Sequence, residues 1–135
     1  MQFGAVTDIG MHRKINEDNY YVNESDTFPY AVVADGMGGH QAGEVASMMV
    51  FDIIENHLEK NLDTEPDYVE AGEVIRQAFI SANSIIYKYA KNHYKVMGMG
   101  ATATLALVYQ NKIITAHGGD WRAHMRGDEI KQITI

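Results

Sequence analysis

The stretch AVVADGMGGHQAGEVAS, residues 31–47, decides the fold and the chemistry that we predict for this chain. It opens with a continuous apolar run that ends at Asp35, a pattern typical of a buried strand bounded by a turn. Glycines then occupy three of the next four positions, Gly36, Gly38 and Gly39. Because glycine has no side chain, a ligand can approach the backbone of such a turn closely. We therefore predict a strand that carries the Asp35 carboxylate to an open turn.

The glycine-rich turn does not match the common nucleotide-binding loops. It has no Gly-Lys-Ser or Gly-Lys-Thr, which excludes the phosphate loop of nucleotide hydrolases, and it lacks the Gly-x-Gly-x-x-Gly spacing of dinucleotide sites. The simplest remaining interpretation is a plain Asp-Gly turn without a ligand. Two other segments argue for more than a turn. Upstream, Arg13 precedes the adjacent acids Glu17 and Asp18; downstream, an apolar, strand-like run leads to Asp120.

Carboxylates at the ends of strands suit hard divalent cations. Mg²⁺ and Mn²⁺ prefer oxygen ligands to sulfur, and this chain contains no cysteine. A glycine directly after Asp35 lets the backbone come so close to an ion that the carbonyl can bind it as well. Arginine is planar and permanently charged, and it binds a pair of phosphate oxygens well, which is the role we expect of Arg13. The residues therefore indicate a site for divalent cations and phosphate.

Composition and charge narrow the function classes. The chain has 135 residues, enough for the single domain 1–135 that we expect, and 46% of them are hydrophobic. Its formal charge of -7 is unfavourable for binding polyphosphates, so we expect no nucleic-acid partner. The lack of cysteine excludes disulfides, thiolate zinc sites and a cysteine nucleophile. No leader pattern is evident and no apolar run approaches the ~20 residues that cross a bilayer, so we expect a cytoplasmic protein without a membrane partner.

Two amphipathic helices are expected in the middle of the chain. From Gly43 onward, apolar residues recur every four positions as far as Leu58, with acidic and amide side chains on the opposite face. The segment TEPD then predicts the start of a second helix, with Thr64 as its cap and Pro66 in the first turn. The predicted apolar seam of the second helix consists of Ala71, Ile75, Ala78, Ala82, Ile85 and Tyr89.

Short strands are expected on both sides of the helices. We predict strands in FGAVTD (residues 3–8), YYVN (20–23) and YAVVA (30–34), and again at residues 101–109, 112–117, 122–125 and 129–135, with turns at Gln110-Asn111 and Gly127-Asp128. Strands and helices that occur in separate runs favour an α+β fold with antiparallel sheets over a parallel βαβ array.

Four blocks of the sequence resemble the PPM, or type 2C, family of metal-dependent serine/threonine protein phosphatases, especially its bacterial members. The blocks follow the order of the family and extend from residue 7 to residue 123, so the resemblance covers essentially the whole chain. They are Thr7-Asp8-x-Gly10-x-x-Arg13-x-x-Asn16-Glu17-Asp18, Val33-Ala34-Asp35-Gly36-Met37-Gly38-Gly39-His40-x-Ala42-Gly43-Glu44-x-Ala46-Ser47, Gly98-Met99-Gly100-x-Thr102 and Gly119-Asp120-x-Arg122-Ala123.

The resemblance implies a role for each acidic residue of the site. Asp35 resembles the carboxylate that bridges two catalytic metal ions, and Gly36 the residue whose carbonyl binds one of them. Asp18 resembles an acid that lies in the layer behind the direct metal ligands or binds the metal through a water molecule. Glu17 is its neighbour in the sequence. Asp120 resembles the aspartate that helps to hold a third, weaker metal ion in bacterial members.

The activity that the resemblance implies is hydrolysis of phosphoserine and phosphothreonine in phosphorylated proteins. Arg13 resembles the arginine that binds the substrate phosphate, and we count it with Asp35 among the catalytic residues. Water bridged by two Mn²⁺ or Mg²⁺ ions becomes a nucleophile near neutral pH and attacks phosphorus in line, so no covalent phosphoenzyme is needed. The family fold is an antiparallel β-sandwich flanked by helices, with the metal ions in a cleft at one end.

The chain departs from the family in length and at particular positions. Members are nearly twice as long and carry further metal-binding aspartates in their C-terminal half, so we expect a truncated domain, an incomplete dinuclear site and poor activity. Trp121 stands where a serine is usual. Met37 stands where eukaryotic relatives carry a histidine, and we do not assign the role of that histidine to His40. An exposed sheet edge at residues 129–135 leads us to expect homo-oligomers.

Simpler interpretations of the same residues stay open at this point. Asp18 can cap or end a strand, and Arg13 can pair with acids at the surface. Asp120 can belong to a turn that follows two glycines. The alternative function is a truncated, non-catalytic domain that acts as a binding or interaction module, and a third interpretation is a folding fragment without either role.

Overall fold

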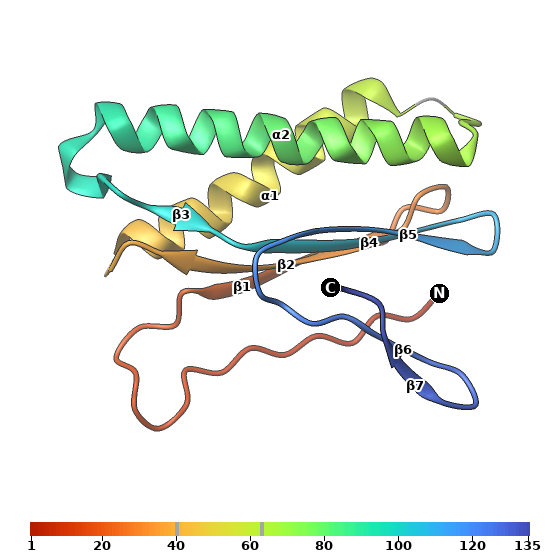
Figure 1. Cartoon of the computed structure of the whole chain (residues 1–135), viewed down its shortest axis with the longest axis horizontal. Helices are drawn as coiled ribbons and strands as arrows, with labels where there is room; N and C mark the ends of the chain where they lie inside the picture. The colour runs from red at the N-terminus through yellow and green to blue at the C-terminus, as the bar shows by residue number, and fades with distance from the viewer. Residues whose placement is uncertain (40, 63) are drawn as a thin grey trace.

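The computed structural model describes residues 1–39, 41–62 and 64–135, so His40 of the glycine-rich block lies outside the described residues. Within these ranges the strands and helices follow one another as predicted, strands first, then helices, then strands (Figure 1). The strands are β1 (Asp18–Asn23), β2 (Tyr30–Met37), β3 (Gly100–Ala101), β4 (Ala103–Tyr109), β5 (Lys112–Gly118), β6 (His124–Arg126) and β7 (Ile130–Gln132). The helices are α1 (Gln41–Asn61), α2 (Tyr68–Asn92) and the short 3-10 helix η1 (Tyr94–Val96).

The main sheet has the strand order β1-β2-β4-β5, and β3 pairs with the last residues of β2. Both long helices cover the same face of this sheet, while β6 and β7 form a separate hairpin on its other side (Figure 1). All of these strand pairs are antiparallel. The predicted α+β class is therefore confirmed, and the two-sheet sandwich that the family resemblance implies stays a prediction.

The hydrophobic core lies between the main sheet and the two helices. Every second residue of β2 is buried, beginning with Tyr30, Val32 and Ala34, because side chains alternate between the two faces of a strand. Ile54 of α1 and Ile75 of α2 are almost completely buried against them. The strand that leads into Asp35 and the amphipathic first helix are thus confirmed, although α1 begins two residues before the predicted Gly43.

The cap of α2 differs from the prediction. Asp67 caps the helix instead of Thr64, because its carboxylate accepts hydrogen bonds from the backbone N–H groups of Val69 and Glu70, both at 2.8 Å. The Glu70 side chain accepts in return from the Asp67 backbone N–H at 3.0 Å. This reciprocal capping box satisfies backbone donors that a helix start otherwise leaves unpaired.

The buried seam of α2 also shifts in its second half. Ile85 and Tyr89, predicted to be buried, are 45% and 38% exposed, and Ile86 and Ala90 are buried in their place. Steps of three and of four residues both keep side chains on one face of a helix. After Ala82 the buried positions continue in steps of four, to Ile86 and Ala90, a pattern that the local sequence does not decide because Ile85 and Ile86 are adjacent and identical.

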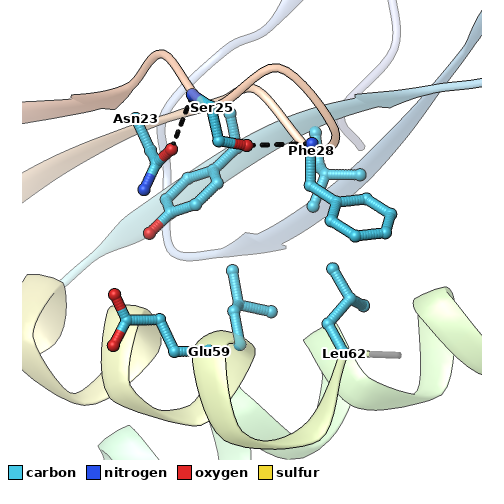
Figure 2. A pocket seen from close by; sticks show the side chains of 8 residues that line it. Asn23, Ser25, Phe28, Glu59 and Leu62 are labelled. Atoms are coloured by element: carbon cyan, nitrogen blue, oxygen red, sulfur yellow. Dashed lines mark hydrogen bonds between the residues drawn. The ribbon is translucent and has the colours of Figure 1, made fainter. Parts of the chain in front are cut away.

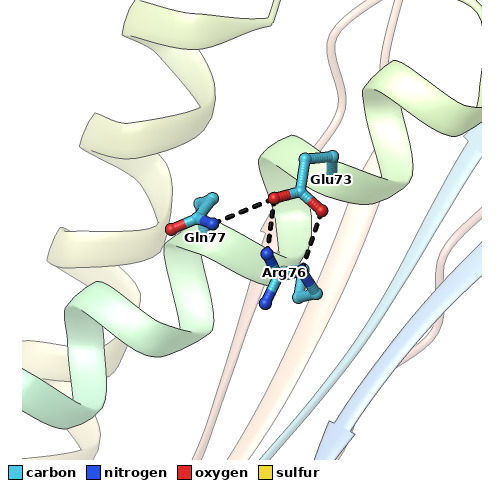
Figure 3. Close-up of polar contacts among 3 residues, drawn as sticks. All are labelled: Glu73, Arg76 and Gln77. Carbon is cyan, nitrogen blue, oxygen red and sulfur yellow. Dashed lines mark hydrogen bonds and ion pairs between the residues drawn. The ribbon is translucent and has the colours of Figure 1, made fainter.

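Three polar side chains form a network on the surface of α2 (Figure 3). Arg76 donates to both carboxylate oxygens of Glu73, at 2.6 and 2.8 Å, and Gln77 donates to Glu73 at 2.9 Å. The hydrogen bond from Arg76 is the main reason why the pKa of Glu73 falls to about 2. Because the Arg76 and Glu73 side chains are more than half exposed, we assign this network little effect on stability. Neither helix in the described ranges is both long and apolar enough to cross a membrane.

The predicted strands are confirmed except at the two ends of the chain. The segment FGAVTD forms no strand, and β7 stops at Gln132 although the apolar pattern continues to residue 135. Between β4 and β5, Gln110 and Asn111 have φ angles of 47° and 62°, as a tight hairpin turn requires. The sheet face opposite the helices stays partly open, with Tyr20 42% and Ile113 55% exposed.

Replacing Ile86 by alanine should destabilise the chain far more than the same change at Ile85. Ile86 is only 6% exposed, and truncating a buried isoleucine costs about 2–5 kcal/mol of unfolding free energy. Ile85 is 45% exposed, and changes at exposed positions usually cost no more than about 0.5 kcal/mol. Urea denaturation of both variants measures the difference, and equal losses would contradict the orientation of α2.

Candidate metal and phosphate site

The aspartates predicted for the site come together at one edge of the main sheet. Because β1 and β2 are antiparallel, the start of β1 lies beside the end of β2, and Asp18 is the direct register partner of Asp35. Residues paired in this way project their side chains from the same face. Strand β5 runs in the same direction as β2, since both are antiparallel to β4, so Asp120 follows it at the same edge.

Asp35 lies in a strongly negative environment. Its partial burial raises its pKa above the ordinary value, and the neighbouring Asp18 raises this pKa further. The charges of Asp120 and Glu17 add to the rise in the pKa of Asp35. Carboxylates gathered in this way repel one another, and a bound cation relieves that repulsion. Across residues 1–39, 41–62 and 64–135, however, no three acidic or histidine side chains lie close enough together to hold a metal ion by themselves.

Two glycines let the end of β2 cross closely over the start of α1. A Cβ atom on Gly43 would collide with Glu17 Oε1 and would lie 2.8 Å from the Gly36 carbonyl oxygen. A Cβ atom on Gly36 would in turn collide with the Gly43 carbonyl. Any side chain at either position would therefore force β2 and α1 apart. The Gly36 N–H also donates to the Glu17 carbonyl at 3.1 Å, which fixes Glu17 beside the turn.

Glu17 joins the candidate metal ligands on structural grounds. Its Oε1 atom is buried and has no hydrogen-bond partner in the part of the chain that the structure describes. A buried carboxylate oxygen without a partner is unfavourable unless a ligand satisfies it. A carboxylate and a backbone carbonyl are oxygen ligands of the kind that Mg²⁺ and Mn²⁺ prefer. The residues present therefore fit a divalent cation held by Glu17, Gly36 and Asp35.

Sequence reasoning named Glu17 only as the neighbour of Asp18. The adjacent pair of acids was the available signal, but the burial of Glu17 depends on Gly43, which lies far along the chain on another element. The local sequence could not show which of the two acids faces the turn.

Thr102 holds Asp35 in place, a role that the sequence analysis did not assign. The Asp35 N–H donates to Thr102 Oγ1 at 3.2 Å, and the Thr102 N–H donates to the Asp35 carbonyl at 2.9 Å. Gly119, with φ of 126°, packs so closely on Thr102 that a Cβ atom there would collide with it. Thr102 therefore connects the backbone of Asp35 to the loop that carries Asp120.

Arg13 is exposed in the loop that precedes β1. Two polar residues close this loop: Asn16 Nδ2 donates to Thr7 Oγ1 at 2.7 Å, and the Asp18 N–H donates to Asn16 Oδ1 at 3.0 Å. Among the described residues Arg13 forms no ion pair, so its charge is available to a ligand. The structure thus places Arg13 on the segment that enters the site, and its contact with phosphate stays a prediction.

Asp120 is exposed, and Trp121 beside it is partly buried. The Trp121 indole Nε1 is buried without a partner in the described part of the chain, and its carbonyl accepts a hydrogen bond from Thr134 Oγ1 at 3.3 Å. The loop that carries Asp120 is therefore fastened to the C-terminal segment. The unusual tryptophan lies next to the residue predicted for a third metal ion.

Comparison with known proteins shows that the chain is similar to bacterial serine/threonine phosphatases. A family model described as protein phosphatase 2C matches residues 12–134. The serine/threonine phosphatase Stp of Listeria innocua is 34% identical in an alignment of 133 positions that covers 95% of this chain and 51% of that protein. PstP of Mycobacterium tuberculosis, a serine/threonine protein phosphatase, is 35% identical in an alignment of 138 positions that covers 99% of this chain and 24% of that protein. The chain spans about half the length of the first of these relatives, and less of the second.

Solved structures of related proteins have the same fold. The serine/threonine phosphatase Stp1 from Staphylococcus aureus matches with a TM-score of 0.83 at 34% identity, over 99% of this chain and 55% of that one. The catalytic domain of PstP, solved in complex with two manganese ions, matches with a TM-score of 0.71 at 33% identity, over 94% of this chain and 52% of that one.

Replacing Asp35 by asparagine should raise the melting temperature of the metal-free chain and abolish Mn²⁺ binding. Folding raises the pKa of Asp35, so above that pKa the charged carboxylate is less favourable in the folded chain than in the unfolded one. The amide removes this cost, and the gain should shrink as the pH falls through the raised pKa. Calorimetry in the presence of a chelator and titration with Mn²⁺ measure the two effects. Asp128→Asn, at an exposed position, is the control. A lower melting temperature for the Asp35 variant would contradict the repulsion between Asp35 and the neighbouring carboxylates.

Proposed function

The chain belongs to the protein phosphatase 2C family, and we propose that it supplies part of a metal-dependent serine/threonine phosphatase site. The observation that carries this proposal is the gathering of Asp35, Asp18 and Asp120 beside a glycine-lined turn. Relatives named as serine/threonine phosphatases support phosphorylated proteins as the substrate class. The manganese ions in the PstP structure support a divalent cofactor, which we expect to be two Mn²⁺ or Mg²⁺ ions with a third bound more weakly.

The residues on β1 and β2 hold the reaction centre in the proposed mechanism. Bound divalent ions supply an activated water and neutralise the charge that develops on the phosphoryl oxygens. Asp35, fixed by Thr102, would hold the ions together with Glu17 and the Gly36 carbonyl. Asp18 lies beside Asp35 and would orient water through its carboxylate. Because β2 is packed rigidly into the core, these oxygens need little rearrangement when ligands bind.

Arg13 and Asp120 complete the proposed site from two loops. Arg13 is permanently charged and would pair with two oxygens of the substrate phosphate, which orients phosphorus for attack from the opposite side. Asp120 would bind the third, weaker ion. Its exposure leaves room for water around such an ion, and the partly buried Trp121 beside it would limit the approach of substrate from that side.

A non-catalytic interaction module is the second candidate function. It is favoured because, within the described residues, no three acidic or histidine side chains lie close enough together to hold a metal ion. It is also favoured by the partly open sheet face and by the free outer edge of β5, which support self-association of this chain.

The 135-residue chain should hydrolyse p-nitrophenyl phosphate slowly. Its turnover rate should be orders of magnitude below the typical enzyme rate of about 1–10³ per second. Two cations need several carboxylates to hold them, and the residues described offer few. The assay is run at saturating Mn²⁺ with the Asp35→Asn variant as the blank. Slow turnover above the blank supports the phosphatase proposal. No turnover despite Mn²⁺ binding supports the interaction module. Turnover at an ordinary enzyme rate would mean that the site is complete.

Arg13→Ala should raise KM for a phosphate monoester about ten- to a hundredfold in any preparation that shows Mn²⁺-dependent turnover. Loss of one charge-assisted contact is worth about 1.5–3 kcal/mol. Metal affinity should change little, because Arg13 carries no oxygen ligand. Lys14→Ala, the neighbouring exposed cation, is the matched control. An unchanged KM would mean that Arg13 is only a surface charge and does not bind the substrate phosphate.

A further inference from the structure

A separate pocket of about 260 Å³ is lined by residues of the β1–β2 loop, β2, β4 and α1. Figure 2 shows its lining side chains. The pocket opens between the β1–β2 loop and the last turns of α1. Tyr30, which lines it, is five residues before Asp35 on the same strand. At about 3.3 Å per residue this spacing places the two residues about 17 Å apart. The pocket therefore cannot belong to the proposed metal site, and an inference about it does not rest on the phosphatase proposal.

The pocket contains a buried polar group without a partner. Tyr30 is only 4% exposed, and its hydroxyl oxygen has no hydrogen-bond partner in the described part of the chain. The side chain of Asn23 lies near this hydroxyl, yet no hydrogen bond of ordinary geometry joins them. Burial raises the pKa of Tyr30, so the hydroxyl stays neutral and can both donate and accept. A buried hydroxyl without a partner is unfavourable, and a ligand that bonds to it removes the cost.

The walls of the pocket are formed before any ligand binds. Asn23 Oδ1 accepts a hydrogen bond from the Ser25 N–H at 2.9 Å, and Ser25 Oγ accepts one from the Phe28 N–H at 2.9 Å (Figure 2). These bonds hold the β1–β2 loop in its turn. The Phe28 ring packs against the ring of Tyr109 with centroids 5.0 Å apart, which fixes the apolar wall. Little conformational entropy is therefore lost when a ligand enters.

The polar end of the pocket is negative. The exposed side chain of Glu59 on α1 lines this end and brings a carboxylate to it (Figure 2). Glu55, one turn earlier, accepts a hydrogen bond from the Tyr21 hydroxyl, and the charges of both glutamates act on Tyr30. A cation is thus favoured at this end, whereas an anion would be repelled. The opposite wall is apolar and consists of Phe28, Leu58, Leu62 and Leu107.

We propose that this pocket binds a small organic ammonium ion with an apolar body. The ammonium would donate to the Glu59 carboxylate and to the Tyr30 hydroxyl oxygen, and the body would lie against Phe28 and Leu62. A closed apolar cavity of about 150 Å³ holds benzene, so 260 Å³ admits a single ring with an aminomethyl group. Benzylamine, protonated at neutral pH, is the simplest probe of this class.

The test follows backbone amide signals of the ¹⁵N-labelled chain by NMR during titration with benzylamine. Shifts should occur at the pocket residues and not at the Asp35 edge, and benzyl alcohol, the neutral analogue, should bind at least threefold more weakly. Glu59→Gln should weaken benzylamine about three- to tenfold, whereas Glu129→Gln in the distant β6–β7 hairpin should have no effect.

Tyr30→Phe separates a ligand role from a structural one. It should raise the melting temperature of the free chain, because the unpaired hydroxyl is gone, and still weaken benzylamine binding severalfold. The proposal is overturned if folded wild-type chain shows no shifts with benzylamine. It is equally overturned if benzyl alcohol binds as well as benzylamine and Glu59→Gln changes nothing, since the pocket is then only an apolar cavity.

Discussion

The positions of the site residues depend on one constraint, the repulsion between the carboxylates that meet at the end of β2. Asp35 faces Asp18 across the strand pair, and the charges of Asp120 and Glu17 reach the same place. A fold does not gather like charges in a partly buried position without a compensating interaction. The core under β2 and the two hydrogen bonds to Thr102 hold Asp35 there, and a divalent cation is the ligand that would balance the charge.

The glycines follow from the same constraint. Gly36 and Gly43 let α1 begin directly against the end of β2, which brings a carbonyl oxygen and the buried Glu17 carboxylate toward one position. Gly119 lets the loop of Asp120 rest on Thr102. Family membership and this geometry both support the phosphatase site that we propose, while the described residues bring no three acidic or histidine side chains together to hold a metal ion. The pocket at Tyr30 uses the same strand and helix at their other ends, with an unpaired hydroxyl in place of unpaired carboxylates.

Much of this could be predicted from the sequence because its signals are local. The apolar run into Asp35, the four-residue period of α1 and the turn at Gln110-Asn111 each depend on neighbouring residues. The wrong predictions concern features that depend on contacts with residues far away in the sequence. Within the described ranges residues 3–8 pair with no other strand, and the buried seam of α2 passes through Ile86 instead of Ile85 where the helix packs on the sheet.

The effect of Mn²⁺ on the melting temperature of the wild-type chain tests the central claim most directly. A cation that binds only the folded chain stabilises it by mass action, so the melting temperature should rise with Mn²⁺ concentration and fall back when a chelator is added. The same series with Glu17→Gln should show a smaller rise, because the buried Oε1 no longer carries charge. No rise in the wild type, or an equal rise in both proteins, would contradict the account of the carboxylate cluster as a cation site.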